Sequence, residues 1–476
     1  MDLNPTVAAV RAAQTSWAQT PLSVRCEHIQ QIGRRFAKEG QRIVDTVCKE
    51  TRKNPGDAWF ADVLPNLDLF DYWTGAGLEA IKSQKAPISK LKFPKKRATL
   101  TYEPQGIIGL ISPWNYPIAI PLRTLIPALV AGNGVLFKPS EVTPECGALL
   151  AEIFNAVLPT GLLQVVQGAG EAGAAVVDAS DHVIFTGSVA TGRKVALQCA
   201  EQLKKVSLEL GGKDAAIVLA DCDFDRTVQG ILWGATSNSG QNCAAVERVY
   251  VERSIHDAFV TKLVALAQTV DVAPVATEGQ DAIVRGHLAD ALEHGGKIHG
   301  DYPGPVVVTN LPSEAKLLTE ETFGPIIPVV AISNAEDGLQ QANNSRFGLT
   351  TSIWTRNIAL GERLASRAAS GTVTINNASF TAAMPFAPWY GQGESGSGVT
   401  NSHLAILDMV HPKFILVDES TDPEAWWYPL SGQASDLAKT SVEWLSARGL
   451  SKLGKTMGVL GAMKRRVAEQ KAWFKV

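Results

Sequence analysis

A cysteine in a polar turn is the first residue of this chain that could do chemistry. Cys243 follows the Gly/Asn/Ser-rich stretch 237–242 and precedes an alternating apolar run that ends at Val251. The turn offers free backbone N–H groups, and the strand-like run offers a rigid base. We therefore expect an exposed thiol beside donors that stabilise an oxyanion, as a nucleophilic cysteine requires. The alternative is a small buried hydrophobe, which is the commoner role of a free cysteine.

Two further polar residues fit the chemistry of such a thiol. Glu209 lies inside the apolar run 208–210, where a carboxylate costs energy unless it is paired or its pKa is raised. A pKa raised toward neutrality suits a general base for water. Asn115 stands between Pro113 and Pro117, so its side-chain NH₂ is held where it can donate to an oxyanion. A rigid structural turn is the alternative for Asn115.

Two predicted strand ends carry groups that suit a dinucleotide. Lys138 and Glu141 stand just beyond one strand, and a carboxylate there can accept both hydroxyls of an adenosine ribose. Gly187 and Ser188 end another strand and open a helix, whose free N–H groups and dipole can hold a pyrophosphate. The chain has no GxGxxG motif at this point, so a solvated charged loop and an ordinary helix cap remain alternatives.

The elements that must position these residues alternate in type. Residues 5–85 read mainly as helices, and 98–111 contain two strands around a turn. Strands and helices then alternate from 135 to 210 and again over 249–375. This pattern predicts parallel sheets covered on both faces. We expect two α/β domains with Cys243 near their seam, where such folds place ligands.

Composition excludes several classes of protein. The 476 residues are 45% hydrophobic and 19% charged, as in an ordinary soluble enzyme, and the net charge of −3 argues against a nucleic-acid binder. Six scattered cysteines without a CxxC motif predict reduced thiols and a cytoplasmic location. The histidines form no metal-ligand pattern, and we expect His287, His294 and His299 on solvated loops. Neither a signal peptide nor a membrane-spanning segment is expected.

The end of the chain differs from the rest. From residue 439 to 476 nine Lys and Arg stand against two Glu, a charge of +7, while the preceding residues total −10. Aromatic and aliphatic residues lie between these cations, which is typical of an interfacial amphipathic segment that contacts a membrane peripherally. Packing on a dimer partner is the alternative. Glycines at 449, 454, 458 and 461 weaken a continuous helix here.

Several of these segments, in this order, resemble the aldehyde dehydrogenase superfamily. The resemblance covers residues 5–417, and eight motifs in one order make it very specific. They lie at 113–117, 127–133, 137–141, 185–188, 209–213, 240–243, 320–325 and 343–349. The resemblance implies an α/β protein with two Rossmann-like parallel-sheet domains and a small β oligomerisation element. Its expected parts are a dinucleotide-binding domain (1–85 and 105–209), a catalytic domain (210–395), oligomerisation strands (86–104 and 411–418) and a basic, aromatic-rich tail (419–476).

The resemblance also implies roles. Cys243 matches the nucleophile, Asn115 with the Cys243 N–H the oxyanion hole, and Glu209 the base that activates water. Trp114 matches a cofactor contact, and Lys138 and Glu141 match the residues that contact the adenosine ribose. Gly187 and Ser188 match the residues that contact the pyrophosphate. Glu321 matches the residue that contacts the nicotinamide ribose, and Phe323 matches the residue that packs on the nicotinamide. NAD is the expected cofactor because the Glu141 carboxylate repels a 2′-phosphate, with NADP as the alternative.

The implied function is NAD-dependent oxidation of a small-molecule aldehyde to a carboxylic acid through a cysteine thiohemiacetal and thioester. A structural or binding protein of the same fold is one alternative, and a CoA-acylating dehydrogenase, which would more naturally lack Glu209, is another. The sequence does not reveal the aldehyde. Arg123, about two helical turns after Asn115, can bind a substrate carboxylate, which would favour semialdehydes, but the sequence favours a solvent-facing or interface arginine.

Three departures from the family pattern carry expectations of their own. The leading strand pair of many tetrameric members is missing, which favours a homodimer. Arg52 stands where the family usually has the glycine of Thr-Gly-Lys. Residues 387–391 replace the usual Gly-Gly near the substrate mouth, so an unusual substrate pocket is expected.

Overall fold

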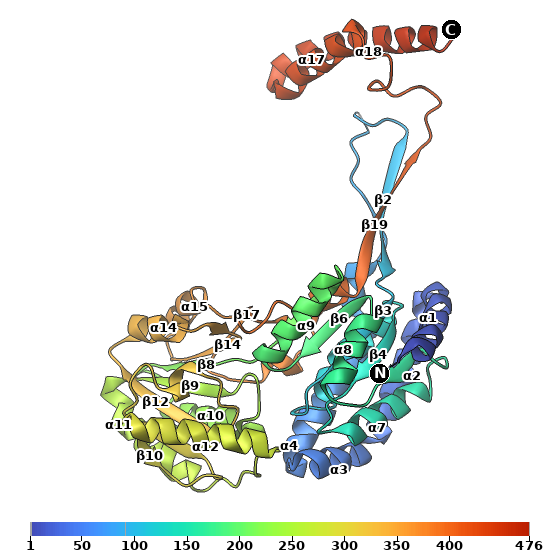
Figure 1. The fold of residues 1–476 in the computed structure, drawn as a ribbon. Coiled ribbons are helices and arrows are strands. Elements are labelled where there is room, and N and C mark those ends of the chain that lie inside the picture. The colour runs from blue at the N-terminus through green and yellow to red at the C-terminus, as the bar shows by residue number, and fades with distance from the viewer. Residues whose placement is uncertain (1, 91, 476) are drawn as a thin grey trace. The chain divides into compact units, whose positions relative to one another are not determined.

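Strands and helices alternate along most of the chain, as the sequence pattern predicts. The computed structural model describes residues 2–90 and 92–475, and the chain divides into two units (Figure 1). Unit 1 is Met1–Lys82 with Tyr102–Pro412, and unit 2 is Ser83–Thr101 with Lys413–Val476. The predicted α/β class with parallel sheets is therefore confirmed.

The first sheet of unit 1 has five parallel strands in the order β5-β4-β3-β6-β7. Its central strands are apolar and buried along their whole length, as expected for a parallel sheet covered on both faces. The strands are β3 (Ile107–Ile111), β4 (Gly134–Lys138), β5 (Leu163–Val165), β6 (His182–Thr186) and β7 (Lys205–Glu209).

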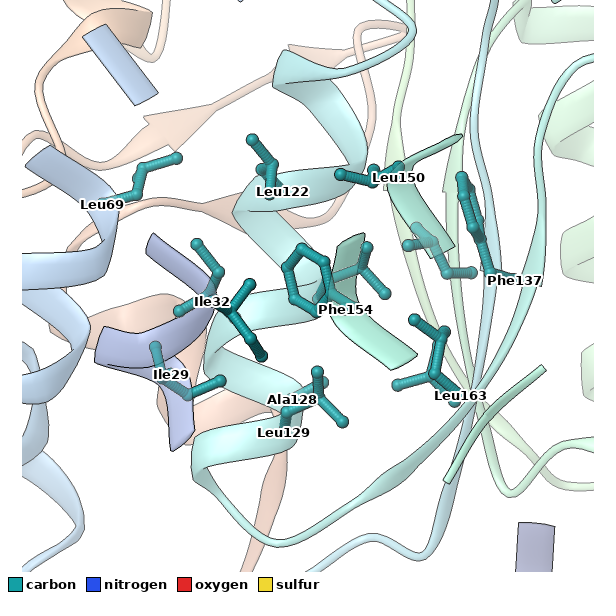
Figure 2. Close-up of a cluster of buried hydrophobic side chains, with 14 of the residues drawn as sticks. Ile29, Ile32, Leu69, Leu122, Ala128, Leu129, Phe137, Leu150, Phe154 and Leu163 are labelled. Atoms are coloured by element: carbon teal, nitrogen blue, oxygen red, sulfur yellow. The ribbon is translucent and has the colours of Figure 1, made fainter. Parts of the chain in front are cut away.

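Helices cover both faces of this sheet. Side chains of β3 alternate between the two cores: Ile107 packs with α1 (Asn4–Gln19), α8 (Gly170–Ala179) and α9 (Val189–Glu201). Ile108 packs on the opposite side with α6 (Ala119–Val130) and α7 (Pro144–Asn155), behind which lie α2 (Leu22–Lys38), α3 (Gly40–Thr51) and α5 (Leu67–Thr74). Figure 2 shows this second core, where Ile29, Ile32, Leu129 and Phe154 converge beside the strand that carries Phe137.

The winding of the sheet creates a crevice. From β3 the chain proceeds to β4 and β5 on one side, then returns to place β6 and β7 on the other side of β3. The border between β3 and β6 is therefore a topological switch point, and ligands of open α/β sheets bind outside the carboxyl ends of the strands there. Residues 112–115 follow β3, and residues 187–188 follow β6. The fold brings both predicted loops to this edge.

The second sheet of unit 1 has seven strands in the order β10-β11-β12-β9-β8-β14-β15, parallel except for β10. Helices α10 (Phe224–Thr236) and α11 (Arg253–Ala267) cover one face, α14 (Ala335–Asn343) and α15 (Ile358–Ala365) the other. The strands are β8 (Asp214–Val218), β9 (Val246–Glu252), β10 (Lys297–His299), β11 (Val306–Thr309), β12 (Ile326–Ile332), β14 (Thr350–Trp354) and β15 (Thr372–Ile375).

Shorter elements complete unit 1, and two histidines expected on solvated loops lie elsewhere. His287 lies buried in α12 (Glu278–Glu293), with Nδ1 3.1 Å from Thr322 Oγ1. His299 is the half-buried last residue of β10, with Nε2 3.1 Å from Thr309 Oγ1. The remaining elements are α4 (Pro55–Ala58), α13 (Lys316–Thr319), α16 (Ser402–Asp408), β13 (Phe347–Gly348), β16 (Trp389–Tyr390), β17 (Gln392–Gly393) and β18 (Val399–Thr400). The boundary drawn at residue 209 between two domains stays a prediction.

Unit 2 contains β1 (Gln84–Lys85) and most of β2 (Lys96–Pro104) and β19 (Val410–Asp418), which form a sheet in that order. Two helices follow, α17 (Gly432–Ser446) and α18 (Gly449–Trp473). The glycines at 454, 458 and 461, which were expected to weaken a continuous helix, do not interrupt α18. Packing on α17, including the 3.1 Å hydrogen bond from Trp444 Nε1 to Thr456 Oγ1, outweighs the low helix propensity of glycine.

Candidate active site

Eight of the ten predicted site residues line one cavity of about 220 Å³ in unit 1. These are Trp114, Asn115, Gly187, Ser188, Glu209, Cys243, Glu321 and Phe323. The strand order explains the grouping, because β3, β6 and β7 bring their carboxyl ends to one edge of the first sheet. The other two residues, Lys138 and Glu141, lie beyond β4 outside this lining, joined by a 2.7 Å ion pair.

Cys243 forms part of the wall between this cavity and a second one. The second cavity has a volume of about 370 Å³ and shares Cys243 and Ile120 with the first. Its lining is largely aromatic and apolar, with the charged residues Asp57 and Arg123. Trp389, from the segment that departs from the family pattern, also lines it. A molecule in either cavity can therefore approach the Cys243 side chain.

The thiol is less accessible than the sequence suggested. Cys243 is half-buried, not exposed. Burial, reinforced by Asp214 and Glu321, raises the pKa of the Cys243 thiol to about 12, and the nearby Arg123 guanidinium opposes this rise. The thiol is therefore protonated at neutral pH in this state, and its Sγ lies 3.8 Å from Asn242 Oδ1, to which it donates. Activation requires a proton acceptor or additional positive charge in the site.

Glu209 has the surroundings of a general base. It is the last residue of β7 and only 4% exposed. Neither carboxyl oxygen has a hydrogen-bond partner among the residues that the structure describes. Burial therefore raises the pKa of Glu209 well above its ordinary value, and Arg123 counteracts this only in part. A raised pKa makes the ionised carboxylate a stronger proton acceptor, which suits a general base for water.

Asn115 is held by a network that local sequence reasoning missed. Its Nδ2 donates to the Gln241 carbonyl at 3.1 Å, and its own carbonyl accepts from Asn238 Nδ2 at 3.0 Å. That carbonyl also accepts from Lys53 Nζ at 3.1 Å, and Lys53 forms a fully buried 2.7 Å ion pair with Asp62. The network joins the Asn115 turn to the turn before Cys243.

The segment before Lys53 explains one departure from the family. Arg52 caps the end of α3 in the left-handed region, with φ of 62°. Glycine adopts this conformation without strain, which accounts for the glycine usual at this point in the family. Arg52 itself adopts this conformation, and Lys53 directly after it reaches the Asn115 carbonyl. The signal that could have identified Lys53 was its place in this motif.

A second buried pair shapes the turn that carries Glu321 and Phe323. Glu247 accepts from the backbone N–H groups of Thr322 and Phe323 at 2.7 and 2.8 Å, and from Lys213 Nζ at 2.6 Å. Phe323 takes a left-handed φ of 52° and packs edge-on against Trp114, with ring centroids 5.7 Å apart. Lys213 and Glu247 interrupt apolar runs in the same way as Glu209, which is the signal that could have identified them.

Two glycines allow the parts of the site to approach closely. A Cβ on Gly211 would lie 2.2 Å from a Glu321 carboxyl oxygen, and one on Gly240 would lie 2.1 Å from the Gly324 carbonyl. The Glu321 carboxylate accepts from the Gly212 N–H at 3.0 Å, and burial raises the pKa of Glu321 to about 8. Glycine at 211 and at 240 therefore lets the backbone approach the turn that contains Glu321 and Phe323, where any side chain at either position would collide with it.

The cavity fits a dinucleotide cofactor. Ser188 caps the N-terminus of α9, where the free N–H groups of residues 188–190 and the helix dipole suit a pyrophosphate. Trp114 and Phe323 offer aromatic surfaces, and Glu321 lies in a cradle that only glycine at 211 leaves open. Fold and site together define a dinucleotide-dependent α/β enzyme with a cysteine beside the cofactor cavity.

Comparison with known proteins assigns the family. The model of the aldehyde dehydrogenase family matches residues 1–415, and the chain belongs to this family; it is an NAD(P)-dependent aldehyde dehydrogenase. It is 33% identical over 452 residues to the 4,4′-diapolycopene aldehyde oxidase of a Methylomonas species, covering 91% of this chain and 85% of that protein.

Two other matches agree. A Mycobacterium ulcerans protein provisionally named an NADP(+) succinate-semialdehyde dehydrogenase is 33% identical over 425 residues, covering 83% of this chain and 80% of that protein. The NAD⁺ complex of an aldehyde dehydrogenase from Bacillus cereus superposes with a TM-score of 0.84 at 30% identity, covering 88% of this chain and 89% of that one. The predicted recognition and the NAD(P) cofactor are thereby confirmed.

Proposed function

We propose that the enzyme oxidises its aldehyde through covalent intermediates on Cys243. The observation that carries this proposal is the place of Cys243 between the cavity that fits the cofactor and a second cavity open to a substrate. The Cys243 thiol loses its proton to solvent water, and the thiolate sulfur adds to the carbonyl carbon of the aldehyde, whose oxygen becomes an oxyanion. Asn115 Nδ2 and the Cys243 N–H donate to this oxyanion, as preorganised donors do at developing charge.

Loss of a hydride from the same carbon converts the thiohemiacetal into a thioester. NAD(P), when bound, supplies the hydride acceptor. Glu209 then takes a proton from water, the water oxygen attacks the thioester carbon, and the Cys243 thiolate leaves, which yields the carboxylic acid. The unpartnered Glu209 carboxyl supports this assignment, because it is free to accept that proton.

We further propose that the preferred aldehyde carries a carboxylate. Arg123 does not face solvent as the sequence analysis favoured; it lines the second cavity, and its Nε is buried with no hydrogen-bond partner in the described part of the chain. A half-buried guanidinium whose buried Nε lacks a partner is destabilised, and a substrate carboxylate would remove that cost. The Mycobacterium ulcerans relative, named for succinate semialdehyde, agrees with this class.

A long apolar aldehyde is the second candidate. The aromatic lining of the second cavity, which includes Phe60, Trp233, Phe380 and Trp389, favours it. The Methylomonas relative, whose name refers to 4,4′-diapolycopene aldehyde, agrees with such a substrate.

Stopped-flow detection of NADH with succinate semialdehyde, butanal and decanal, each with and without CoA, tests the whole proposal. We expect CoA-independent turnover and the highest kcat/KM with succinate semialdehyde. Arg123→Met should raise KM for that substrate at least about tenfold, the cost of losing one charge-assisted contact, and leave KM for butanal unchanged. No NADH with any aldehyde would contradict the enzyme mechanism, and a preference for decanal unaffected by Arg123→Met would establish the second candidate.

A further inference from the structure

Unit 2 carries a strong positive charge, and its two helices lie outside the family match. Its residues include sixteen Lys and Arg against seven Asp and Glu, a net charge of +9, whereas unit 1 has a net charge of −12. The family model ends at residue 415, before the helices of unit 2. Nothing in the proposed catalytic mechanism uses these helices, so they need a separate explanation.

The acidic side chains of unit 2 are largely neutralised within the unit. Asp418 and Glu424 pair with Lys96, Glu419 with Arg97, Asp422 with Lys471, Asp436 with Arg465, and Glu469 with Arg466. The excess of cations is therefore available to an anionic partner. Such a partner would gain more from this unit than from the acidic remainder of the chain.

An apolar stripe runs along α18. Leu450, Leu453, Met457 and Leu460 are 87, 71, 74 and 49% exposed. Their spacing of three and four residues places them on one face of the helix. Lys464 follows Met457 by two helical turns and continues the same face. The opposite side of α18 is buried, and Arg466 donates from there to the carbonyls of Ala425 and Trp427.

Aromatic residues extend this exposed apolar surface. Trp426, Trp427 and Tyr428, just before α17, are 56, 51 and 65% exposed. Between α17 and α18 lies an apolar cavity of about 480 Å³ that Trp426, Trp444 and Leu460 help to line. Lys452 Nζ lies 4.5 Å from the centre of the Trp444 ring. Tryptophan and lysine beside aliphatic residues are the composition of the boundary between water and a bilayer.

We propose that unit 2 docks the enzyme on the surface of an anionic phospholipid bilayer. The stripe on α18 and the aromatic residues before α17 enter the headgroup region, while the surplus lysines contact lipid phosphates. No helix in the described ranges, 2–90 and 92–475, has an apolar stretch long enough to cross a bilayer, so contact is with the surface. Protein–protein interfaces are depleted in lysine, which makes a second copy the less favoured occupant. This inference does not depend on the identity of the aldehyde.

Vesicle co-sedimentation of the full chain tests the proposal. We expect the enzyme to pellet with phosphatidylcholine vesicles that contain about 30 mol % phosphatidylserine, and not with pure phosphatidylcholine. Leu453→Gln with Met457→Gln should lower the partition coefficient at least about tenfold, because two exposed apolar side chains are removed from the contact. The matched control is Leu197→Gln with Leu203→Gln in unit 1, whose side chains are 67 and 95% exposed.

The control pair should bind vesicles like the wild type, and both pairs should retain full activity with a water-soluble aldehyde. Lys455→Gln with Lys464→Gln should weaken binding, whereas Lys194→Gln with Lys297→Gln in unit 1 should not. Raising the salt from about 0.05 M to about 0.5 M should release the protein by screening.

Two results would overturn the proposal. One is a wild-type protein that stays in the supernatant with anionic vesicles at low salt. The other is equal loss of binding in the unit 1 control pair. In the first case, sedimentation equilibrium of the Leu453→Gln with Met457→Gln variant shows what the stripe does instead. A lower oligomeric mass than the wild type would make the stripe an interface between copies of the chain.

Discussion

Glu209→Gln should separate the two halves of the proposed reaction. Glutamine has nearly the same shape but cannot accept a proton from water. A positioned general base contributes about 10²–10⁴-fold to a rate, so thioester hydrolysis should slow by that factor, a rise of about 3–5 kcal/mol in its barrier. Formation of the thioester does not use Glu209. The variant should therefore give a burst of NADH equal to the enzyme concentration, followed by slow turnover.

The same substitution should stabilise the fold, and increasingly so at higher pH. Burial raises the pKa of Glu209 well above its ordinary value of 4.5, so above about pH 4.5 the unfolded chain loses this proton while the folded chain keeps it. Between that pH and the folded-state pKa, this group lowers wild-type stability by up to about 1.4 kcal/mol per pH unit. Glutamine does not titrate, and no side-chain hydrogen bond is lost because the Glu209 carboxyl oxygens accept none from the described residues.

Stopped-flow fluorescence and urea unfolding at pH 5 and pH 8 measure the two effects. The stability difference between variant and wild type should be larger at pH 8. Asp214 and Glu321, whose pKa values burial also raises to about 8, titrate in both proteins, so their contributions cancel. Surface Glu201→Gln is the control and should change neither property. A variant without a burst, or a stability difference that does not grow with pH, would refute the assignment of Glu209.

Three further predictions follow from other residues. Glu141→Ser removes a charge that repels the 2′-phosphate of NADP. The ratio of kcat/KM for NADP to kcat/KM for NAD should therefore rise at least about tenfold. An unchanged ratio would show that the Glu141 side chain swings away from the 2′-phosphate. Lys53→Met should lower the free energy of unfolding by about 3–5 kcal/mol because it leaves the buried Asp62 charge unpaired. Adding Asp62→Asn to the same chain should recover part of that loss. A double variant no more stable than Lys53→Met alone would argue against a stabilising Lys53–Asp62 ion pair. Sedimentation velocity should show a homodimer that Phe414→Glu with Leu416→Glu dissociates, as these side chains of β19 are 60 and 50% exposed, and a wild-type monomer would contradict it.

The sequence revealed those site residues that break a local pattern. Glu209 stood out as a carboxylate in an apolar strand, and Gly187 and Ser188 as a turn between a strand and a helix. Parallel strands then bring such ends together without any further information. Lys138 and Glu141 were likewise found as a pair three residues apart, and the structure joins them at 2.7 Å.

Pairing across long separations could not be predicted in this way. Lys53 reaches the Asn115 carbonyl, and Glu247 holds the Phe323 turn, through contacts that no local spacing encodes. Burial was also misjudged at Cys243, because a polar turn indicates exposure only until other elements pack around it. Helix α18 shows the same limit, since its packing on α17 outweighs its glycines.

The most direct test of the central claim is to trap the covalent intermediate. Glu209→Gln is mixed with NAD and succinate semialdehyde, quenched in acid during the burst, and digested for peptide mass spectrometry. We expect one acyl group per active site, attached to the peptide that contains Cys243 and absent after Cys243→Ala. An NADH burst without an acylated Cys243, or with the acyl group on another cysteine, would contradict the proposed mechanism.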